Sequence, residues 1–245
     1  MVAPDKYTAE KILWIHPWAP NLFSFRLTRF SGFRFVPGQF ARLGVKKPDP
    51  NNPKNPSGEK IAWRAYSIVS ADYDEHLEFY SIVVPGGEFT SELSRLKVGD
   101  TVYVEKTNYG FLTLDRFEGG ADLWMLSTGT GLAPFISMLW DPRTWEQYEN
   151  LIVVHSVRYP NELAYADTIG AFRGHELFAP MARRLHYVQA VTRAAVPGAL
   201  EKRIPAAIAD GSLEAHAGLP FDHDRSRILI CGNPEMVDDT RKLLA

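Results

Sequence analysis

The sequence predicts two domains, an antiparallel β-domain followed by an α/β domain with a doubly wound parallel sheet. At 245 residues the chain is long enough for two domains. Its first half has short runs of alternating apolar and polar residues with turn residues between them. Its second half alternates apolar strands with helical patterns. The change occurs near Asp115, close to the flexible Glu118-Gly119-Gly120, so we expect domains at residues 1–115 and 116–245.

The predicted strands of the first domain are short and closely spaced. Residues 22–29 place Phe23, Phe25 and Leu27 on one face, a period of two. Further strands are expected at 39–45, 65–69, 77–84 and 101–104, with an exposed loop at 48–58 and a short helix at 90–96 capped by Thr90. This spacing favours a small antiparallel barrel or sandwich.

The second domain repeats a strand followed by a helix. Strands are expected at 123–127, 151–155, 186–191 and 228–231, and helices at 133–140, 162–172, 204–209 and 234–244. Pro134 fits the first turn of its helix. Buried strands that alternate with helices predict a parallel sheet covered on both faces.

Composition excludes several classes of protein. The net charge of -2 and the pI of about 6.4 give no bulk attraction to nucleic acid. A single cysteine, Cys231, excludes an intramolecular disulfide framework and any site built from four cysteines. No run approaches the roughly 18 apolar residues of a membrane span, and the N-terminus does not resemble a secretory signal. We expect a cytoplasmic protein without a metal site and without a nucleic-acid or membrane partner.

Positive charge gathers in the first part of the chain. Residues 1–65 contain 11 Lys and Arg against 4 Asp and Glu, a net charge of +7, and the remainder carries -9. Such asymmetry can steer an acidic partner or a phosphate-rich ligand to one face. A solvated surface of uneven composition explains it equally well.

A glycine-rich segment at 126–134 lies where a strand is expected to lead into a helix. Helix N-termini bind anions through unpaired N–H groups, and Gly129 and Gly131 allow a diphosphate to approach the backbone. Pro134 occupies the place of the third glycine of the dinucleotide-binding fingerprint. A tight turn without a ligand is the alternative.

Arginines follow two neighbouring strands of the second domain. Arg158 comes after the strand at 151–155, and Thr192-Arg193 follows the strand at 186–191. Because ligands of open α/β sheets bind at the carboxyl ends of strands, both arginines are expected to face one crevice. Arg203 opens the next helix. Converging guanidiniums suit a phosphate monoester, which favours NADP over NAD; each arginine alone is better explained as an exposed charge.

In the first domain, Arg64-Ala65-Tyr66-Ser67 combines a guanidinium, an aromatic ring and a hydroxyl. On a strand, Arg64 and Tyr66 share one face, which suits a ligand that has both a phosphate and a planar ring. The alternative is a surface cation next to a core tyrosine. Gly86-Gly87 leads into Thr90, which provides a second helix N-terminus suited to anions.

These motifs, in this order, resemble the bacterial-type ferredoxin/flavodoxin–NADP⁺ reductases over essentially the whole chain. The matching segments are Pro37-Gly38-Gln39-Phe40, Arg64-Ala65-Tyr66-Ser67, Leu77-Glu78-Phe79-Tyr80, Thr90, residues 126–134, His155-Ser156-Val157-Arg158-Tyr159, Thr192-Arg193, Arg203-Ile204-Pro205 and Cys231-Gly232-Asn233-Pro234-Glu235-Met236. The resemblance implies an N-terminal FAD-binding β-barrel and a C-terminal NADP-binding α/β domain.

For FAD, the resemblance implies that Arg64 holds its phosphate, that Ala65 is among the cofactor contacts and that Tyr66 stacks on the isoalloxazine. Ser67 would bond near flavin N5. Along the flavin, the implied contacts are Tyr80, Ile82 and Val83, and the backbone of Glu88, Phe89 and Thr90 would meet the diphosphate.

For NADP(H), the resemblance places the turn Thr128, Gly129 and Thr130 between the two cofactors. The other implied contacts are Arg158, Thr192, Arg193, Arg203, Gly232, Asn233 and Met236, with Thr192 and Arg193 at the 2′-phosphate. Cys231 would lie beside the nicotinamide and would be catalytic together with Tyr66 and Ser67; the alternative is a buried, inert cysteine.

The implied activity is an oxidoreductase that passes a hydride between NADP(H) and FAD N5 and electrons between the flavin and a one-electron carrier. The basic first segment would fit an acidic ferredoxin or flavodoxin, and a monomer is expected. The sequence leaves open which carrier is used and in which direction electrons flow. The alternatives are a related NAD(P)H–flavin reductase or electron-transfer module, and a non-catalytic flavin-binding protein.

Two departures from the family are visible. The loop at 48–58 is longer than expected, and we interpret it as a surface insertion near the flavin entrance. The chain stops at Ala245, within the last expected helix, whereas the family continues by roughly twenty residues to an aromatic end that covers the flavin. We favour truncation, with a more exposed flavin as its consequence; the alternative is that another aromatic such as Trp63 substitutes.

Overall fold

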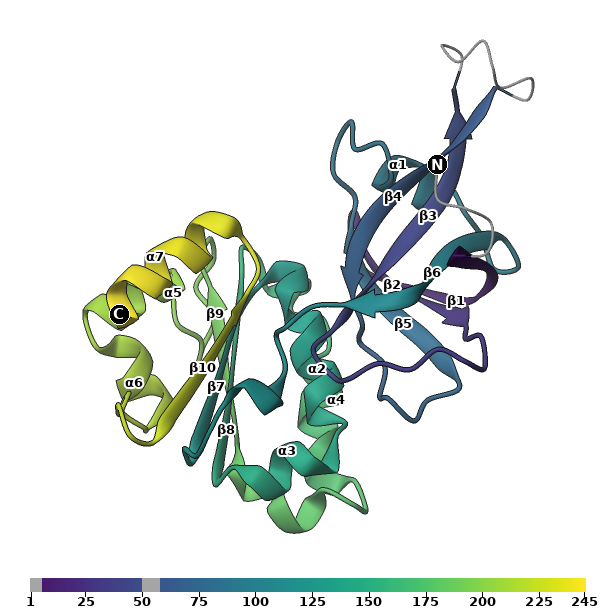
Figure 1. The fold of residues 1–245 in the computed structure, drawn as a ribbon. Helices are drawn as coiled ribbons and strands as arrows, with labels where there is room; N and C mark the ends of the chain where they lie inside the picture. Colours follow the sequence, from purple (N-terminus) through teal and green to yellow (C-terminus); the bar gives the residue numbers. More distant parts are fainter. Residues whose placement is uncertain (1–5, 50–57) are drawn as a thin grey trace. The chain divides into compact units, whose positions relative to one another are not determined.

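The computed structural model describes residues 6–49 and 58–245, so residues 50–57 of the expected loop insertion lie outside the described part. The chain divides into two compact units, Met1–Phe111 and Leu112–Ala245 (Figure 1). Residues 112–115, which the sequence placed with the first domain, belong to the second unit. Each unit has its own core and is described separately.

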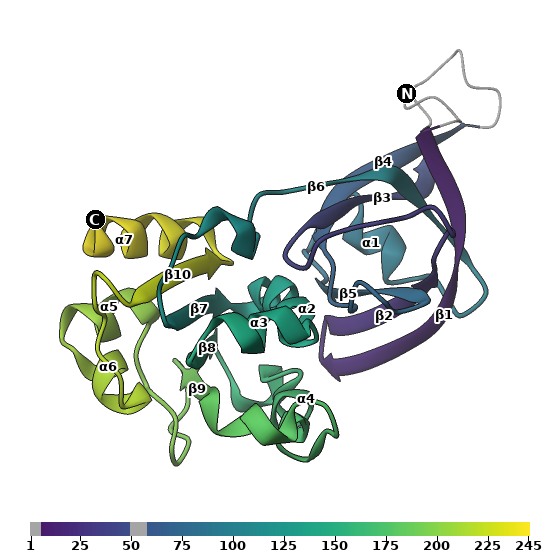
Figure 2. The same cartoon turned by 60° about the horizontal axis from the view of Figure 1, so that its bottom comes forward.

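The first unit is an antiparallel barrel of six strands. They are β1 (Tyr7–Ala19), β2 (Leu22–Thr28), β3 (Phe40–Pro48), β4 (Glu59–Ser67), β5 (His76–Ile82) and β6 (Thr101–Tyr109). The strand order is β4-β3-β6-β1-β2-β5. The two end strands are joined just beyond β4, where Ile68 bridges Phe79 and the Val69 N–H donates to the Glu78 carbonyl at 2.9 Å. Figure 2 shows how these strands curve.

Inward-facing apolar residues build the core of the barrel. Phe25 and Leu27 are buried, and Phe23 packs against the same cluster, which confirms the expected alternation along β2. Leu77 and Phe79 join them from β5, Leu93 from the short helix α1 (Thr90–Leu93), and Phe89 from the position just before that helix. Burying each of these side chains stabilises the fold by about 1.5–3 kcal/mol.

Two local predictions for this unit need correction. The long strand β1 was not expected, because Pro17 and the half-buried Trp14 and His16 obscure a period of two. Thr90 is the first residue of α1 rather than its N-cap, a position that Phe89 occupies. The Thr90 hydroxyl instead accepts the Val84 N–H at 3.1 Å and so closes the Gly86-Gly87 turn.

The second unit is a parallel sheet of four strands with helices on both faces. The strands are β7 (Asp122–Thr128), β8 (Asn150–Val157), β9 (Leu185–Val191) and β10 (Ser226–Cys231), in the order β10-β7-β8-β9. Helices α5 (Ile204–Ala209), α6 (Ser212–Ala217) and α7 (Pro234–Leu244) cover one face, and α2 (Ala133–Leu139), α3 (Pro142–Gln147) and α4 (Ala166–Ala171) cover the other (Figure 1).

The helix expected at 162–172 is broken. A 3₁₀ turn η4 (Pro160–Glu162) precedes Tyr165, whose φ of 62° interrupts the chain before α4 begins. The bounds of α5 and α7 are those expected, whereas α3 and α6 were not predicted. The remaining 3₁₀ turns are η2 (Leu114–Arg116), η3 (Gly129–Leu132), η5 (Phe172–Gly174) and η6 (Ala179–Arg184).

The strand order reverses at β7, since β8 and β9 lie on one side of it and β10 on the other. At this switch point the loops after β7 and β10 touch. A Cβ on Gly131 would overlap the Cys231 carbonyl, and a Cβ on Gly232 would overlap the Thr128 hydroxyl. The Asn233 N–H donates to the Thr128 hydroxyl at 2.8 Å. Glycine at these two positions therefore sets how closely the loops approach.

We predict that Gly131→Ala destabilises the protein by about 1–3 kcal/mol, because the added methyl group meets backbone that cannot move aside cheaply. Urea unfolding measures this change in the free energy of unfolding. The matched control is Gly170→Ala in α4, where no atom lies within 4 Å of the new Cβ. Because alanine favours helix over glycine, the control should gain up to about 1 kcal/mol. Equal effects of the two substitutions would contradict the prediction.

Candidate functional site

Arg64 and Tyr66 share one face of β4, as expected, and it is the face directed to the barrel core. Their cross-strand partners are Leu43 and Ala41, both fully buried in the barrel core. Arg64 is exposed, and its guanidinium donates to the Trp63 carbonyl at 2.8 Å. Tyr66 is partly buried, and Ser67 ends the strand beside it. A cation and an aromatic ring therefore occupy neighbouring positions of one face.

The Tyr66 ring is fixed by contacts inside the barrel. Its centroid lies 5.3 Å from that of Phe89 and 6.2 Å from those of Phe25 and Phe79. Its hydroxyl and that of Ser81 are 2.8 Å apart. Burial raises the pKa of Tyr66 to about 12, so the phenol remains protonated at neutral pH. The ring is held in one position and carries no charge.

A group of three cations surrounds Glu88. Its carboxylate lies 2.9 Å from the Lys47 ammonium and 3.7 Å from that of Lys60. The hydrogen bond from Lys47 is the main cause that lowers the pKa of Glu88, and the field of Arg64 contributes. Lys60 also lies 4.0 Å from the Asp49 carboxylate, so three positive charges face two carboxylates beside the Gly86-Gly87 turn. The cations that remain in excess fit a ligand that carries phosphate.

Of the other residues predicted to contact FAD, some are buried in this unit and others lie at its surface. The side chains of Phe89 and Tyr80 are buried, so Phe89 presents only its backbone to a ligand. Ile82 is 44% exposed, Ala65 is exposed and Val83 is partly buried. Thr90 uses its hydroxyl in the turn described above.

Trp63 does not share the face of Tyr66. It alternates to the outer side of β4, where its ring lies 5.5 Å from that of Tyr7 and where the Arg42 guanidinium sits 5.9 Å above it. The pleat of the strand thus directs Trp63 to the side of β4 opposite Tyr66.

In the second unit, the glycine-rich segment forms a turn at the end of β7. Thr128, Gly129 and Thr130 are partly exposed, and Gly131 is buried against β10. Gly129 has a φ of +50°, and no atom lies within 4 Å of the position that a Cβ would take there. One side of the turn is thus packed against protein, while the side of Gly129 has free space for a ligand.

The two strand-end arginines are neighbours. The Arg193 N–H donates to the Arg158 carbonyl at 2.9 Å. Arg158, Arg193 and Arg203 are exposed, and none of them forms an ion pair with a described residue. Thr192 donates both its N–H and its hydroxyl to the Val157 carbonyl, at 3.0 and 3.1 Å. The arrangement offers uncompensated guanidiniums to a phosphate monoester.

The sequence analysis missed Glu162, which shapes this loop. Its carboxylate accepts the N–H groups of Arg158 and Tyr159, at 2.9 and 3.1 Å. A glutamate at the end of a proline-initiated turn is a signal for such capping and could have indicated its role. Glu162 therefore holds the backbone that carries Arg158.

At the end of β10, Cys231 is partly buried, and burial raises the pKa of its thiol to about 11. The thiol is therefore protonated at neutral pH and is not an activated nucleophile. Gly232 follows with a φ of 140°. The Asn233 side chain caps α7 by accepting the N–H groups of Glu235 and Met236. The side chain of Met236 is buried in the core, so only its backbone can meet a ligand.

His155 lies beneath the glycine-rich turn. Its side chain is fully buried, and its Nε2 is 3.2 Å from the Gly129 carbonyl oxygen. Its Nδ1 has no hydrogen-bond partner among the described residues. Burial lowers the pKa of His155 to about 4, so the ring is neutral at physiological pH.

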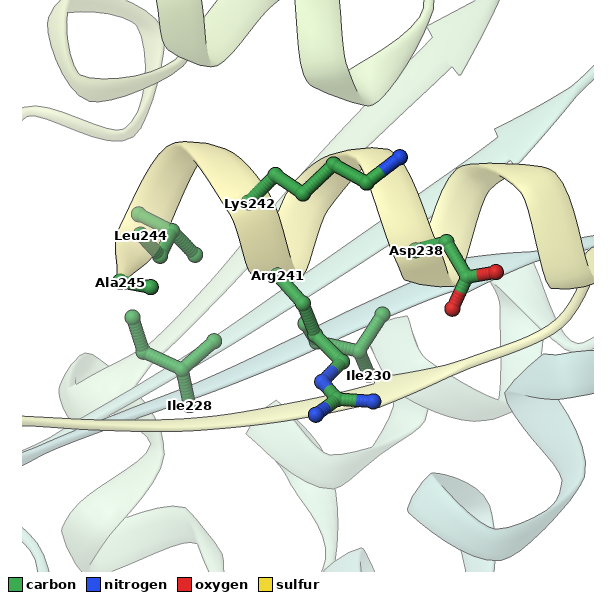
Figure 3. Close-up of a pocket in the computed structure, with 7 residues that line it drawn as sticks. All are labelled: Ile228, Ile230, Asp238, Arg241, Lys242, Leu244 and Ala245. Atoms are coloured by element: carbon green, nitrogen blue, oxygen red, sulfur yellow. The ribbon is translucent and has the colours of Figure 1, made fainter.

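A cavity of about 580 Å³ lies elsewhere, between α7 and the outer edge of β10 (Figure 3). It is lined by Ile228, Ile230, Asp238, Arg241, Lys242, Leu244 and Ala245. None of the residues predicted from the sequence lines it. Within the described residues, no cluster of three or more His, Cys, Asp or Glu forms a metal site, and no helix is long and apolar enough to span a membrane.

We predict that His155 makes the protein sensitive to acid. The folded-state pKa of about 4 is below the ordinary value of 6.5, so the unfolded chain binds the proton more tightly. Its contribution to stability is complete above pH 6.5 and is lost as the pH falls towards 4, by roughly 3 kcal/mol. The free energy of unfolding, measured from pH 7 to pH 4, should fall less steeply in His155→Leu than in the unaltered protein. Parallel pH curves for the two proteins would show that this histidine does not titrate as described.

Comparison with known families gives a match in the second unit. The model of the oxidoreductase NAD-binding domain matches residues 125–242, which contain the glycine-rich turn, the three arginines and Cys231.

Known relatives cover nearly the whole chain. A ferredoxin–NADP reductase of Pseudomonas aeruginosa is 42% identical over 96% of this chain and 88% of its own length. A flavodoxin/ferredoxin–NADP reductase of Escherichia coli is 36% identical with the same coverage. The crystal structure of a ferredoxin–NADP⁺ reductase of Neisseria gonorrhoeae with bound FAD and NADP is 37% identical, with a TM-score of 0.86 over 98% of this chain and 90% of that one.

Proposed function

The chain belongs to the family of ferredoxin–NADP and flavodoxin/ferredoxin–NADP reductases, and we propose that it passes electrons between NADP(H) and a ferredoxin or flavodoxin through FAD. The observation that carries this proposal is the presence of two separate phosphate-suited sites. One lies around Arg64 and Tyr66, and the other around Arg158 and Arg193. A flavin supplies the chemistry that couples a hydride donor to a one-electron carrier.

In the first unit, Arg64 holds the FAD phosphate together with the positive field of Lys47 and Lys60. Tyr66 stacks on the flavin, and its support by Phe25, Phe79 and Phe89 preorganises the ring for that contact. Ser67 hydrogen-bonds near flavin N5, and the backbone of Glu88, Phe89 and Thr90 receives the diphosphate. A Cβ on Gly87 would lie 2.7 Å from the Thr90 hydroxyl, so glycine at this position keeps the turn tight.

In the second unit, Arg158 and Arg193 bind the 2′-phosphate of NADP(H), and Arg203 adds a third positive charge. Three exposed guanidiniums without ion-pair partners among the described residues support this assignment. NADPH therefore is the favoured reductant over NADH, which lacks the 2′-phosphate. The protonated thiol of Cys231 acts as a neutral group beside the nicotinamide.

The partner is an acidic ferredoxin or flavodoxin. The net charge of +7 in residues 1–65 supports this choice, because opposite charges raise the rate of encounter. We place the protein in the cytoplasm, a reducing compartment that suits a chain with a single cysteine, and we expect a monomer.

The test of the proposed function is an absorbance spectrum followed by titration with NADPH. The purified protein should be yellow with bound FAD, and NADPH should bleach the flavin bands. A colourless protein that does not take up FAD would overturn the proposal.

We predict that Arg193→Ala weakens discrimination between NADPH and NADH by roughly 10–100-fold, because one charge-assisted bond to the 2′-phosphate is lost. The measurement is kcat/KM for both nucleotides with ferricyanide as acceptor. The matched control is Arg173→Ala, since Arg173 is also exposed and lies on the same unit. An unchanged ratio in Arg193→Ala would remove this residue from the nucleotide site.

We predict that reduction of an acidic carrier slows as salt rises, because screening weakens attraction between opposite charges. Stopped-flow rates of carrier reduction from 20 to 300 mM salt measure this effect. Lys106→Glu on β6, an exposed position of the first unit, should lower the low-salt rate by a few-fold, and Arg173→Glu serves as the control on the other unit. The rate of flavin reduction by NADPH should not change in Lys106→Glu. A carrier rate that is independent of salt would argue against an acidic partner.

A further inference from the structure

We propose that His155 is a positioning residue for NADP(H), which holds the Gly129 carbonyl beneath the turn and thereby directs the Thr130 N–H outward to the nucleotide diphosphate. The proposal rests on NADP(H) binding at this unit, as argued above. His155 does not touch the nucleotide in this account, because its ring is fully buried. It acts through the backbone of the turn.

The hydrogen bond between His155 and the turn has only one possible direction. The Gly129 carbonyl can only accept, so the Nε2 atom of His155, 3.2 Å away, is the donor. A neutral imidazole carries one N–H, which leaves Nδ1 without a proton. Nδ1 is buried and has no partner among the described residues. Within the described part of the chain the ring therefore makes a single hydrogen bond, and that bond goes to the turn.

The direction of the Gly129 carbonyl also sets the direction of the Thr130 N–H. In a trans peptide unit the C=O and the N–H point in opposite directions. Because the Gly129 carbonyl is held on the buried side, the Thr130 N–H of the same peptide unit faces away from His155. Thr130 is partly exposed, and the space around the Gly129 Cβ position is free of protein atoms. The N–H is thus presented on the side open to a ligand.

Other contacts already fix the remainder of the turn. Gly131 packs on the backbone of Cys231, and the Thr128 hydroxyl accepts the Asn233 N–H. The peptide unit between Gly129 and Thr130 lies between these two anchors, and His155 is the side chain that fixes it from below. A histidine with one orphaned nitrogen is a poor choice for packing alone, whereas support of an anion-binding turn explains why a donor is present there.

The experiment compares two ligands on the FAD-containing protein by titration calorimetry. NADP⁺ carries the diphosphate and the 2′-phosphate, whereas adenosine 2′-monophosphate carries only the latter. His155→Leu should weaken NADP⁺ binding by about tenfold, the effect of one misdirected hydrogen bond to a charged group. Binding of adenosine 2′-monophosphate should not change, because the arginines that hold it are untouched.

A second pair of variants separates the donor from the packing. In His155→Gln the side-chain amide can reach the Gly129 carbonyl and should retain most of the NADP⁺ affinity. His155→Asn is shorter, cannot reach it and should behave like His155→Leu. Equal affinities of the Gln and Asn variants would overturn the proposal, as would a parallel loss of both ligands in His155→Leu. If the unaltered protein does not bind NADP⁺, the proposed function fails instead, so the two failures are distinguishable.

Discussion

The contact between the loops after β7 and β10 is the constraint on which the nucleotide site depends. These strands are adjacent in the sheet but far apart in the sequence, and their carboxyl ends meet at the point where the strand order reverses. Gly131 and Gly232 have no side chains to separate the two loops, and the bond from Asn233 to Thr128 joins them. With this contact in place, the glycine-rich turn has one packed side and one open side. A larger residue at either glycine would change both the stability of the unit and the shape offered to a ligand.

Charge in the second unit is divided between surface and interior. The groups close to the turn are neutral, because burial keeps the His155 imidazole uncharged and the Cys231 thiol protonated. The positive charges are the exposed arginines on the loops after β8 and β9 and at the start of α5. Because the groups beneath the turn are neutral, the turn attracts anions through its backbone dipoles. At the position expected for the phosphate monoester, the guanidiniums supply a full positive charge. This division suits a dinucleotide whose two phosphate-bearing parts differ in charge and shape.

Several elements could be predicted from the sequence because a local signal determines them. The bounds of α5 and α7 follow from a proline in the first turn, and Asn233 supplies the cap of α7. The backbone contact between Arg158 and Arg193 follows from parallel topology alone, since both residues come just after neighbouring strands. Other features depend on tertiary contacts that no local pattern records. Thr90 resembles a cap but bonds to Val84, and Met236 fits a cofactor motif while its side chain fills the core.

The role of His155 likewise depends on tertiary contacts and has no local signal in the sequence. A histidine at the end of an apolar run is predicted to be one more residue of the strand. Its role depends on which carbonyl lies within hydrogen-bonding distance once the sheet has formed. Here that carbonyl belongs to Gly129, 26 residues earlier in the chain. The parallel pairing of β7 with β8 sets His155 opposite Ser127, two residues before Gly129, so the register of the sheet brings the ring under the turn. A shift of one residue in that register would direct the imidazole to the other face of the sheet. The His155 side chain therefore links the register between β7 and β8 to the geometry of the glycine-rich turn.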